Sequence, residues 1–411
     1  MPGNTKQRGI SKMQTLPIIR RWLPGGALLA VSVFIASAGV VVAAESNPII
    51  IGVVESKTGF MSAYDGPPSQ GIDLAVKHIN DAGGVLGRPI QIISFDQKTD
   101  PALAATGATA LIDQGAVAIV AACDFDFGSP AAVVANTRQI PAISTCAGDP
   151  KFGVQGIGPY AYSMALGSNY QAAALAEWTY ATKNWHTAYV ITDTTVEYTK
   201  GLARYFKDSY ADFGGIIVGE TNISMKDLSI GAQINNLKSL DPAPDQIFIA
   251  SFVPNLTSVV SQIRAAGVEI PIVGGSGYDG EEWALAIPNL SEVYFGAEGY
   301  TLGPAVPSQW ALAEKYRETY GSAPTSSTFL TGYSVIQTFA AAIEQAGTTD
   351  GPAVNDKLSN LKEEPTILGS LSYTPTNHSP LRPMALNAFS NGKVIFLDFI
   401  TPSNLRDAFE K

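Results

Sequence analysis

Two aspartates stand directly after an apolar run in the first half of the chain, on either side of an aromatic residue. Asp124 and Asp126 could each receive the ammonium group of a ligand, or pair with a cation across a cleft. Aspartate also forms turns and caps helices, so a structural role for both residues stays open. This acidic turn is the first candidate for chemistry in the sequence.

Cys123 and Cys146 are the two cysteines of the chain, and each follows an apolar run. In the common doubly wound strand order these runs are neighbouring strands, and adjacent strands lie about 4.8 Å apart. That spacing is within the roughly 4.4–6.8 Å that separates the Cα atoms of a disulfide. We therefore predict a Cys123–Cys146 disulfide at the rim of a cleft; two inert thiols at strand ends are the alternative.

Aromatic and polar residues also follow apolar runs in the second half. Tyr198 comes after the first run, Phe252 after the third, and Ser276 and Asp279 after the fourth. Open parallel sheets bind ligands outside the carboxyl ends of their strands, and a pocket combines apolar walls with a few polar groups. These residues fit a ligand pocket, although packing beside a hinge would use the same aromatics.

The sequence lacks the motifs of common cleft enzymes. Ser276 has Tyr278 two residues later, where a nucleophile elbow requires glycine, and no nucleotide phosphate loop is present. His78, His186 and His378 stand in unrelated contexts, so no zinc cluster is indicated. The acidic turn could supply an acid and a base, but no nucleophile accompanies it. We predict no catalytic residue, metal or cofactor.

Short apolar runs alternate with helical patterns in both halves. Nearly continuous Val, Ile and Ala runs are typical of strands buried on both faces. The runs cover residues 49–54, 90–95, 118–122, 140–144, 187–192, 216–220, 246–250 and 270–274. An apolar stripe of Ile72, Val76 and Ile79, ended by Gly83, exemplifies the helices between them. This alternation predicts an α/β fold with parallel sheets.

The two halves resemble each other weakly, which predicts two similarly folded lobes. The third and fourth runs begin 22 residues apart in the first half and 24 in the second, and both fourth runs begin Ile-Pro. Chance similarity between two strand–helix arrays is the alternative. After residue 294 the pattern predicts helices at 308–320, 326–346 and 352–361 and short strands at 368–373 and 394–399. These elements complete the two lobes rather than form a third core.

Residues 1–44 have the pattern of an export signal. A stretch with five cations precedes an apolar run at 27–42 and small residues at Ala43 and Ala44. The run is short for a membrane span, which needs roughly 20 residues; a retained anchor is the alternative. Because no cysteine lies at the signal boundary, we expect an exported, periplasmic protein that is soluble and not lipid-anchored.

The chain becomes more acidic when the signal is removed. Its 26 Lys and Arg fall to 21 against 36 Asp and Glu, which changes the net charge from −10 to −15. Such a surface repels phosphate backbones and anionic headgroups. We therefore expect that the protein binds neither nucleic acid nor a membrane surface. We also expect a monomer whose ligand is a small molecule.

One long block and several shorter matches extend over nearly all of the chain after residue 44. They are Ile51-Gly52-Val53-Val54, Thr58-Gly59, Tyr64, the block 71–88 (which ends Ile-Asn-Asp-Ala-Gly-Gly-Val-Leu-Gly-Arg), Asp96, Asp100-Pro101, 111–115, Tyr198, Gly201-Leu202-Ala203 and Ile270-Pro271. In these residues the chain resembles the periplasmic leucine/isoleucine/valine-type substrate-binding proteins of ABC importers.

The resemblance implies the type I periplasmic binding protein fold, in which two doubly wound parallel-sheet lobes are joined by a three-stranded hinge and close on the ligand. It divides the chain into a first lobe at 48–165 plus about 298–375 and a second lobe at 166–297 plus about 376–411. The implied ligand contacts are Tyr64, Asp124, Asp126, Ser129, Cys146 and Gly148 from the first lobe and Tyr198, Phe252 or Val253, and Ser276 from the second.

The chain departs from the family pattern at two places. The family's serine-rich turn is acidic and aromatic here, and its threonine after the fourth strand is Gly148. The family's acid for the α-ammonium is replaced by Ser276, with Asp279 available as a substitute. An acidic turn receives a carboxylate poorly, because like charges at close range repel. An amino acid, an amide and an amine all remain open as ligands.

We interpret the chain as an extracytoplasmic solute-binding protein that captures an amino acid or a related amide or amine and delivers it to the membrane permease of an ABC importer. A ligand sensor or receptor-type binding domain without transport is the alternative, and a cleft enzyme is the weaker one. The chain ends at Lys411 without a further membrane span or signalling domain, which favours the first interpretation.

Overall fold

The computed structural model describes residues 47–406, 408 and 409. The predicted export signal at 1–44 lies outside these residues. Residues 45–411 form one compact unit, which is organised by two large sheets. Among the described helices, none has both the length and the apolar character needed to span a bilayer.

The first sheet is fully parallel and has the strand order β2-β1-β3-β4-β5. Its strands are β1 (Ile49–Glu55), β2 (Ile90–Asp96), β3 (Ala118–Ala121), β4 (Ala142–Ser144) and β5 (Ala161–Ser163). This is the order of a doubly wound α/β sheet, in which crossover helices alternate between the two faces. The central strands are buried along their whole length, as their apolar runs predict.

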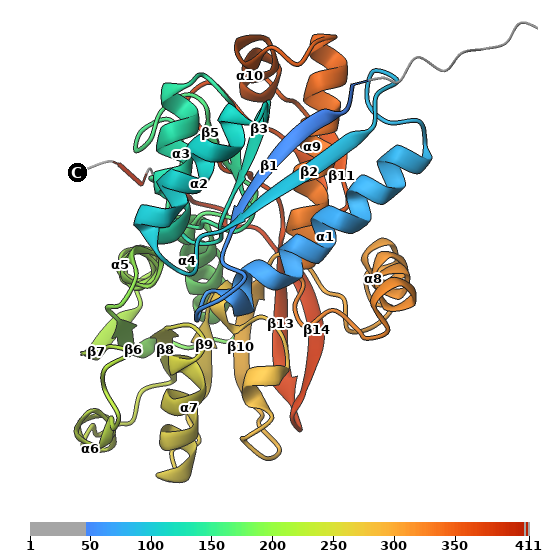
Figure 1. The fold of residues 1–411 in the computed structure, drawn as a ribbon. Helices are drawn as coiled ribbons and strands as arrows, with labels where there is room; N and C mark the ends of the chain where they lie inside the picture. Colours follow the sequence, from blue (N-terminus) through green and yellow to red (C-terminus); the bar gives the residue numbers. More distant parts are fainter. Residues whose placement is uncertain (1–46, 407, 410–411) are drawn as a thin grey trace, which may run out of the picture. The chain divides into compact units, whose positions relative to one another are not determined.

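Helices cover both faces of the first sheet. They are α1 (Ser62–Asp81), α2 (Pro101–Asp113), α3 (Phe125–Thr137), α8 (Pro307–Tyr320), α9 (Phe329–Ala346) and α10 (Gly351–Ser359). Figure 1 shows α1 and α9 on one face and α2 and α3 on the other, and each face has its own apolar core. The hairpin of β11 (Glu364–Thr366) and β12 (Gly369–Leu371) completes this lobe.

Two glycines let α1 and α9 cross closely. A Cβ at Gly71 would lie 1.9 Å from the Phe329 carbonyl oxygen, and one at Gly332 would lie 2.0 Å from the Pro68 carbonyl oxygen. Any larger residue at either position would therefore push the helices apart. The crossing matters for the site, because α1 and the start of α9 both contribute residues to it.

The second sheet has the order β14-β13-β10-β9-β8-β6-β7. Its strands are β6 (Thr187–Asp193), β7 (Ile216–Ile223), β8 (Gln246–Ala250), β9 (Ile272–Gly274), β10 (Val293–Ala297), β13 (Met384–Ser390) and β14 (Lys393–Ile400). The first five are parallel, whereas β13 and β14 are added as an antiparallel edge.

Helices also cover both faces of the second sheet. They are α4 (Ser168–Glu177), followed by a π-helical turn at Trp178–Thr182, α5 (Glu197–Asp212), α6 (Gly231–Lys238) and α7 (Asn255–Ala265), with 3₁₀ turns at Ser276–Tyr278 and Glu282–Ala284. One apolar core lies under α4 and α5 and another under α6 and α7. The predicted fold, two doubly wound α/β lobes, is confirmed.

The eight predicted strand runs are all confirmed as β1–β4 and β6–β9, with bounds that differ by at most two or three residues. The three helices predicted after residue 294 correspond to α8, α9 and α10. Strands β5, β10, β11 and β13 were not predicted from the sequence. Because β10 was not predicted, Glu298, which follows it and lines the cavity, was not identified as a candidate site residue.

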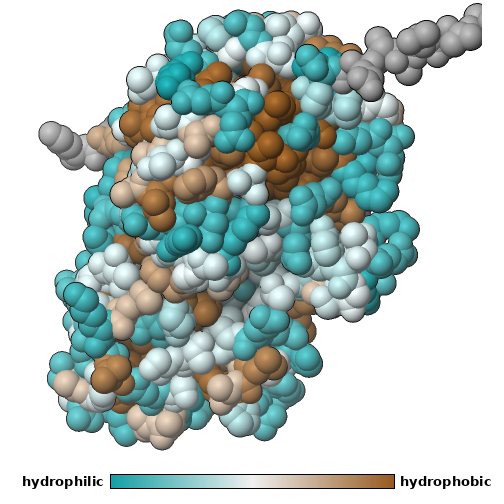
Figure 2. All heavy atoms as spheres, viewed as in Figure 1, coloured by the Kyte–Doolittle hydropathy of each residue, from teal (hydrophilic) through white to brown (hydrophobic). Residues whose placement is uncertain are grey.

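On the face shown in Figure 2, hydrophobic residues gather over the part of the first lobe where Figure 1 shows β1 and β2. β2 is an edge strand with half-buried Ile92 and Ile93. The strand next to it, β1, is central and almost completely buried. The surface colouring thus reflects the exposed edge of the first sheet.

Candidate ligand-binding site

A cavity lies where the carboxyl ends of the parallel strands in the two lobes face each other. It offers about 40 Å³ to the centres of water molecules, several times the roughly 10–15 Å³ that one water needs. The lining residues are Met61, Tyr64, Cys123, Asp124, Cys146, Val196, Tyr198, Phe252, Ser276, Gly277, Glu298 and Thr328. Both lobes and the connection after β10 therefore contribute to one small, mostly apolar chamber.

Tyr64 reaches from α1 of the first lobe to the backbone of the second. Its hydroxyl accepts a hydrogen bond from the Val253 N–H at 2.7 Å and donates one to the Gly277 carbonyl oxygen at 3.2 Å. A Cβ at Gly277 would lie 2.7 Å from the Ser251 carbonyl oxygen, so this turn needs glycine. Tyr64 thus forms a direct contact between lobes and one wall of the cavity.

The next residue on α1 supports the cavity from behind. The buried carboxylate of Asp65 accepts hydrogen bonds from the Ser56 and Cys123 N–H groups, both at 2.7 Å. Burial raises the pKa of Asp65 to about 7, although these hydrogen bonds oppose the shift. Asp65 therefore joins the ends of β1 and β3 to the start of α1.

The acidic turn after β3 places Asp124 inside the cavity wall. Asp124 caps α3 with a positive φ of 75°, and its Oδ1 accepts a hydrogen bond from the Asp126 N–H at 2.8 Å. Burial, and then the charge of Asp126, raise the pKa of Asp124 to about 8. The environment favours the neutral acid unless a positive charge comes close.

A disulfide between Cys123 and Cys146 fixes this turn, as predicted, with a Cα–Cα distance of 4.6 Å. It joins the ends of the neighbouring strands β3 and β4. Both cysteines line the cavity, so the disulfide forms part of its wall as well as its support.

Tyr198 and Ser276 form the opposite wall. The Tyr198 hydroxyl donates to Gln171 Oε1 at 2.9 Å and lies 3.2 Å from Ser276 Oγ. Gln171 Oε1 also accepts from the Ser276 N–H at 3.0 Å, and Gln171 Nε2 donates to the Leu166 carbonyl oxygen at 2.8 Å. One buried glutamine on α4 thereby holds both cavity residues in place.

Phe252, which follows β8, closes the cavity together with aromatics of the first lobe. Its ring centroid lies 6.3 Å from that of Tyr64 and 6.3 Å from that of Phe60. Phe60 packs edge-on against Phe127 at 5.5 Å. These contacts extend an apolar surface across the boundary between the lobes.

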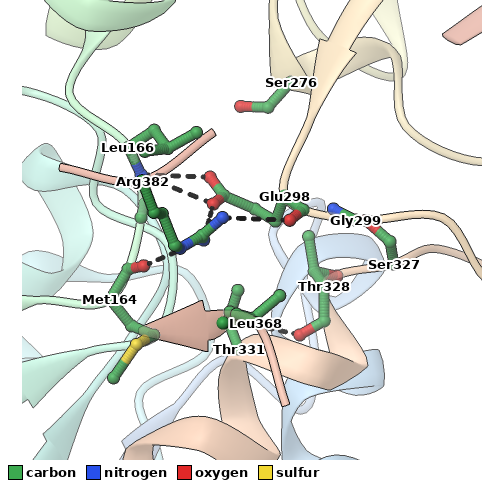
Figure 3. A network of polar contacts seen from close by, with 12 residues as sticks. Met164, Leu166, Ser276, Glu298, Gly299, Ser327, Thr328, Thr331, Leu368 and Arg382 are labelled. Carbon is green, nitrogen blue, oxygen red and sulfur yellow. Dashed lines mark hydrogen bonds and ion pairs between the residues drawn. The ribbon is translucent and has the colours of Figure 1, made fainter. Parts of the chain in front are cut away.

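Glu298 faces the cavity from the connection after β10 and is paired with Arg382. Figure 3 shows the two side chains pointing toward each other, beside the backbone of Met164 and Leu166. The Leu166 N–H donates to Glu298 Oε1 at 3.3 Å, and Arg382 donates to the Glu298 carbonyl oxygen at 3.0 Å. Burial raises the pKa of Glu298, and the charge of Arg382 opposes this shift.

These contacts join all three connections between the lobes. Leu166 precedes α4, Glu298 follows β10, and Arg382 precedes β13. Glu298 and Arg382 are only 2% and 4% exposed, so the pair is shielded from solvent. A ligand that contacts Glu298 therefore contacts the point where the connections meet.

A second space, of about 80 Å³ for water centres, adjoins the cavity and shares Tyr64, Ser276 and Thr328 with it. Asp279 lines this space, and its carboxylate accepts hydrogen bonds from the N–H and hydroxyl of Ser327, both at 2.7 Å. Burial raises the pKa of Asp279 to about 6. Since Ser327 precedes α9, this contact also links the two lobes.

Further polar contacts across the boundary surround the acidic turn. Asp126 Oδ2 accepts from the Glu197 N–H at the start of α5, at 2.8 Å. Lys151 Nζ lies 2.8 Å from Glu197 Oε2 and 3.7 Å from Asp149 Oδ2. Hydrogen bonds from Lys151 and Lys200 lower the pKa of Glu197 to about 2. Asp126 and Lys151 therefore hold the lobes together outside the cavity.

The structure brings together most of the residues singled out in the sequence. Those that line the cavity are Tyr64, Asp124, Cys146, Tyr198, Phe252 and Ser276. Those that lie outside it are Asp126, Ser129, Gly148 and Asp279. Asp126 points to α5, and Gly148 lies behind Tyr198, where a Cβ would be 3.1 Å from the tyrosine ring. Ser129 lies within α3, past its first turn.

Several lining residues were not identified from the sequence. Glu298 follows a strand, so an assignment of β10 would have marked it by the same strand-end rule as the others. Thr328 has no such signal, because it reaches the cavity as the N-cap of α9. Within the described residues no group of three His, Cys, Asp or Glu side chains is placed to hold a metal ion.

Comparison with known proteins places this geometry in a family. The sequence profile of the family described as "Periplasmic binding protein" matches residues 48–393. The chain is 24% identical over 375 residues to "Leu/Ile/Val-binding protein homolog 3" of Brucella melitensis, covering 90% of this chain and 99% of the relative. It is 25% identical over 352 residues to "Leu/Ile/Val-binding protein BraC3" of Rhizobium johnstonii, covering 84% and 93%.

Solved structures show the same fold. The branched-chain amino acid transporter substrate-binding protein LivJ of Streptococcus pneumoniae, solved with isoleucine, superposes with a TM-score of 0.78 at 26% identity, covering 87% of this chain and 100% of LivJ. A solute-binding protein of an ABC transporter from R. palustris, solved with benzoate, has a TM-score of 0.76 at 17% identity, covering 88% and 99%.

Proposed function

This chain belongs to the periplasmic binding protein family, and from that premise we propose that it is an extracytoplasmic solute-binding protein that delivers its ligand to the membrane permease of an ABC importer. The ligand is a small polar organic molecule, an amino acid or a related amide or amine. Capture occurs by closure of the two lobes. The lobes correspond to 48–165 plus about 298–375 and to 166–297 plus about 376–411.

The observation that carries this proposal is the shared construction of the cavity. Tyr64 and Asp124 come from the first lobe, Tyr198 and Phe252 from the second, and Glu298 from a connection between them. A ligand in this position contacts both lobes at once. It therefore favours the closed state by its differential affinity for that state over the open one.

The size and polarity of the cavity support a small ligand with few polar groups. The main chamber is largely apolar, with hydroxyls of Tyr198, Ser276 and Thr328 and the acids Asp124 and Glu298 at its wall. A pocket of this composition orients a ligand by a few polar contacts and excludes water with the rest. Nothing in this arrangement requires a reaction, and we propose binding without catalysis.

Relatives support transport over sensing, since LivJ is named as a transporter substrate-binding protein and the B. melitensis relative as a Leu/Ile/Val-binding protein. We propose that the protein acts in the periplasm as a soluble monomer. A sensor that presents its closed form to a membrane partner is the alternative function, and it shares the same ligand-induced closure.

Native mass spectrometry of the purified protein tests ligand capture. We expect a 1:1 adduct with a small molecule, which raises the melting temperature when added back to ligand-free protein, because only the folded state binds it. The proposal would be contradicted if no amino acid, amide or amine bound to the protein. Uptake of the identified compound by cells with and without the gene separates transport from sensing, since a sensor leaves uptake unchanged.

A further inference from the structure

We propose that Asp124 binds a cationic group of the ligand, so that the cavity prefers a small amine or amino-amide with a net positive charge over a zwitterionic amino acid. This inference rests on the function proposed above and narrows the class of solute. It starts from one carboxylate in the cavity wall.

Asp124 is buried in the cavity wall without a cation. Its side chain belongs to the lining and the residue is 8% exposed. Its Oδ1 accepts a hydrogen bond from the Asp126 N–H at 2.8 Å. Among the described residues no lysine, arginine or histidine forms an ion pair with it. Burial of a carboxylate without a cation is costly, so a ligand cation beside Asp124 would remove that cost.

The charged neighbours of Asp124 add negative charge around it and do not neutralise it. Asp126 and Asp149 are both acidic, and their charges add to the effect of burial in raising the pKa of Asp124. Lys151, the nearby base, is already shared between Asp149 and Glu197. A ligand ammonium or guanidinium would form a charge-assisted hydrogen bond with Asp124, and such bonds are stronger than neutral ones.

The remainder of the cavity offers no charge for a ligand carboxylate. None of the lining residues is basic, and Arg382 is engaged by Glu298 and by the carbonyl oxygens of Met164 and Glu298. A neutral amide or a short carbon chain fits better, because Ser276 and Thr328 present hydroxyls and lead into the adjoining space of about 80 Å³.

A series of four compounds that share the isobutyl group of leucine tests the charge preference. Leucine is a zwitterion, leucinamide and isoamylamine are cations, and 4-methylpentanoate is an anion. By titration calorimetry on ligand-free protein, we expect the two cations to bind roughly tenfold or more tightly than leucine, and the anion not to bind. The readout is the ratio of the leucinamide affinity to the leucine affinity. A change in the closure equilibrium of the lobes affects both affinities alike and therefore leaves the ratio unchanged.

Asp124→Asn should bring this affinity ratio close to one, because it weakens the binding of the cationic compounds. Asparagine tolerates a positive φ and caps helices, so the variant keeps the local fold. Asp81→Asn is the control: it removes an exposed carboxylate of the same lobe, at the end of α1, which is paired with Lys77 outside the cavity, and the ratio should stay as in the wild type.

Tighter binding of leucine than of leucinamide by the wild type would overturn the inference while leaving the proposed function intact. In that case Asp124 acts as a neutral acid that donates to the ligand carboxylate, and Asp124→Asn keeps leucine affinity through its amide. Absence of binding by both cations would also overturn it.

Discussion

Asp124 and Glu298 are both buried and line the same cavity. Glu298 forms an ion pair with Arg382, whereas no basic side chain among the described residues forms an ion pair with Asp124. Glu298 lies where the three connections between the lobes meet, and Arg382 and the Leu166 N–H satisfy its carboxylate. Asp124 lies at a helix start and has acidic neighbours. The comparison separates two roles for an acid in one cavity: Glu298 holds the connections together, and Asp124 is available to a ligand.

Removing Arg382, the partner of Glu298, should have the largest effect and tests the structural role of Glu298. Arg382→Met should lower the free energy of unfolding by about 3–5 kcal/mol, because it leaves a buried carboxylate without its cation. Chemical denaturation measures the change. Arg317→Met is the control, since Arg317 forms an exposed pair with Glu314 and should cost less than about 1 kcal/mol.

The double variant Arg382→Met/Glu298→Gln sharpens the same point. Because it removes the charge as well as its partner, it should recover a large part of the lost stability. If Arg382→Met alone changes stability no more than Arg317→Met does, the pair does not hold the connections together.

Tyr198 tests the cavity without changing its charges. Tyr198→Ala should weaken ligand binding roughly tenfold or more, since it removes an aromatic wall and the hydroxyl next to Ser276. Tyr205→Ala is a matched control on the same helix, outside the cavity lining. Titration calorimetry measures both, and unchanged affinity in Tyr198→Ala would remove Tyr198 from the site.

Asp124 also predicts a dependence of stability on pH. Its pKa is raised to about 8 in the folded protein, above the ordinary value near 4 of an unfolded chain. Between these values the folded state binds more protons than the unfolded state, so stability falls as pH rises from about 4 to 8. Asp65 and Asp279, with raised pKa values of about 7 and 6, act in the same direction.

Asp124→Asn isolates the contribution of one residue to this slope. The variant should be more stable than the wild type at pH 8 and differ less from it at pH 4, as measured by denaturation at each pH. A parallel shift of the two curves would show that Asp124 does not titrate between those values.

The contacts outside the cavity should have the smallest effect. Lys151→Met removes a partly exposed link between Asp149 and Glu197, and such a pair near the surface is worth about 0–1 kcal/mol. We expect ligand affinity to fall by at most about fivefold, mainly through faster dissociation measured by stopped flow. A loss of binding as large as that of Tyr198→Ala would place Lys151 in the ligand site itself.

Sequence patterns predicted the strands well, because strands buried on both faces must be apolar throughout. The disulfide was also predictable, since strand order and spacing bring Cys123 and Cys146 within bonding distance. β10 and β13 were missed, although both are buried. β13 pairs antiparallel with β10 and with the edge strand β14, after the chain has passed through the first lobe, and no local sequence pattern predicts this pairing.

The choice between neighbouring acids was beyond the sequence. Asp124 and Asp126 are two residues apart, but Asp124, which has a positive φ before α3, lines the cavity, while Asp126 bonds to α5. Thr328 is brought to the cavity by the packing of α9 on α1, more than 200 residues away in the chain. Such long-range packing leaves no signature in the residues themselves.

A crystal structure of the protein with its co-purified ligand tests the central claim most directly. We expect the ligand between Tyr64 and Tyr198, in contact with both lobes, and a ligand nitrogen about 2.7–2.9 Å from the carboxylate of Asp124. A ligand bound elsewhere on the molecule, or to one lobe alone, would contradict the account.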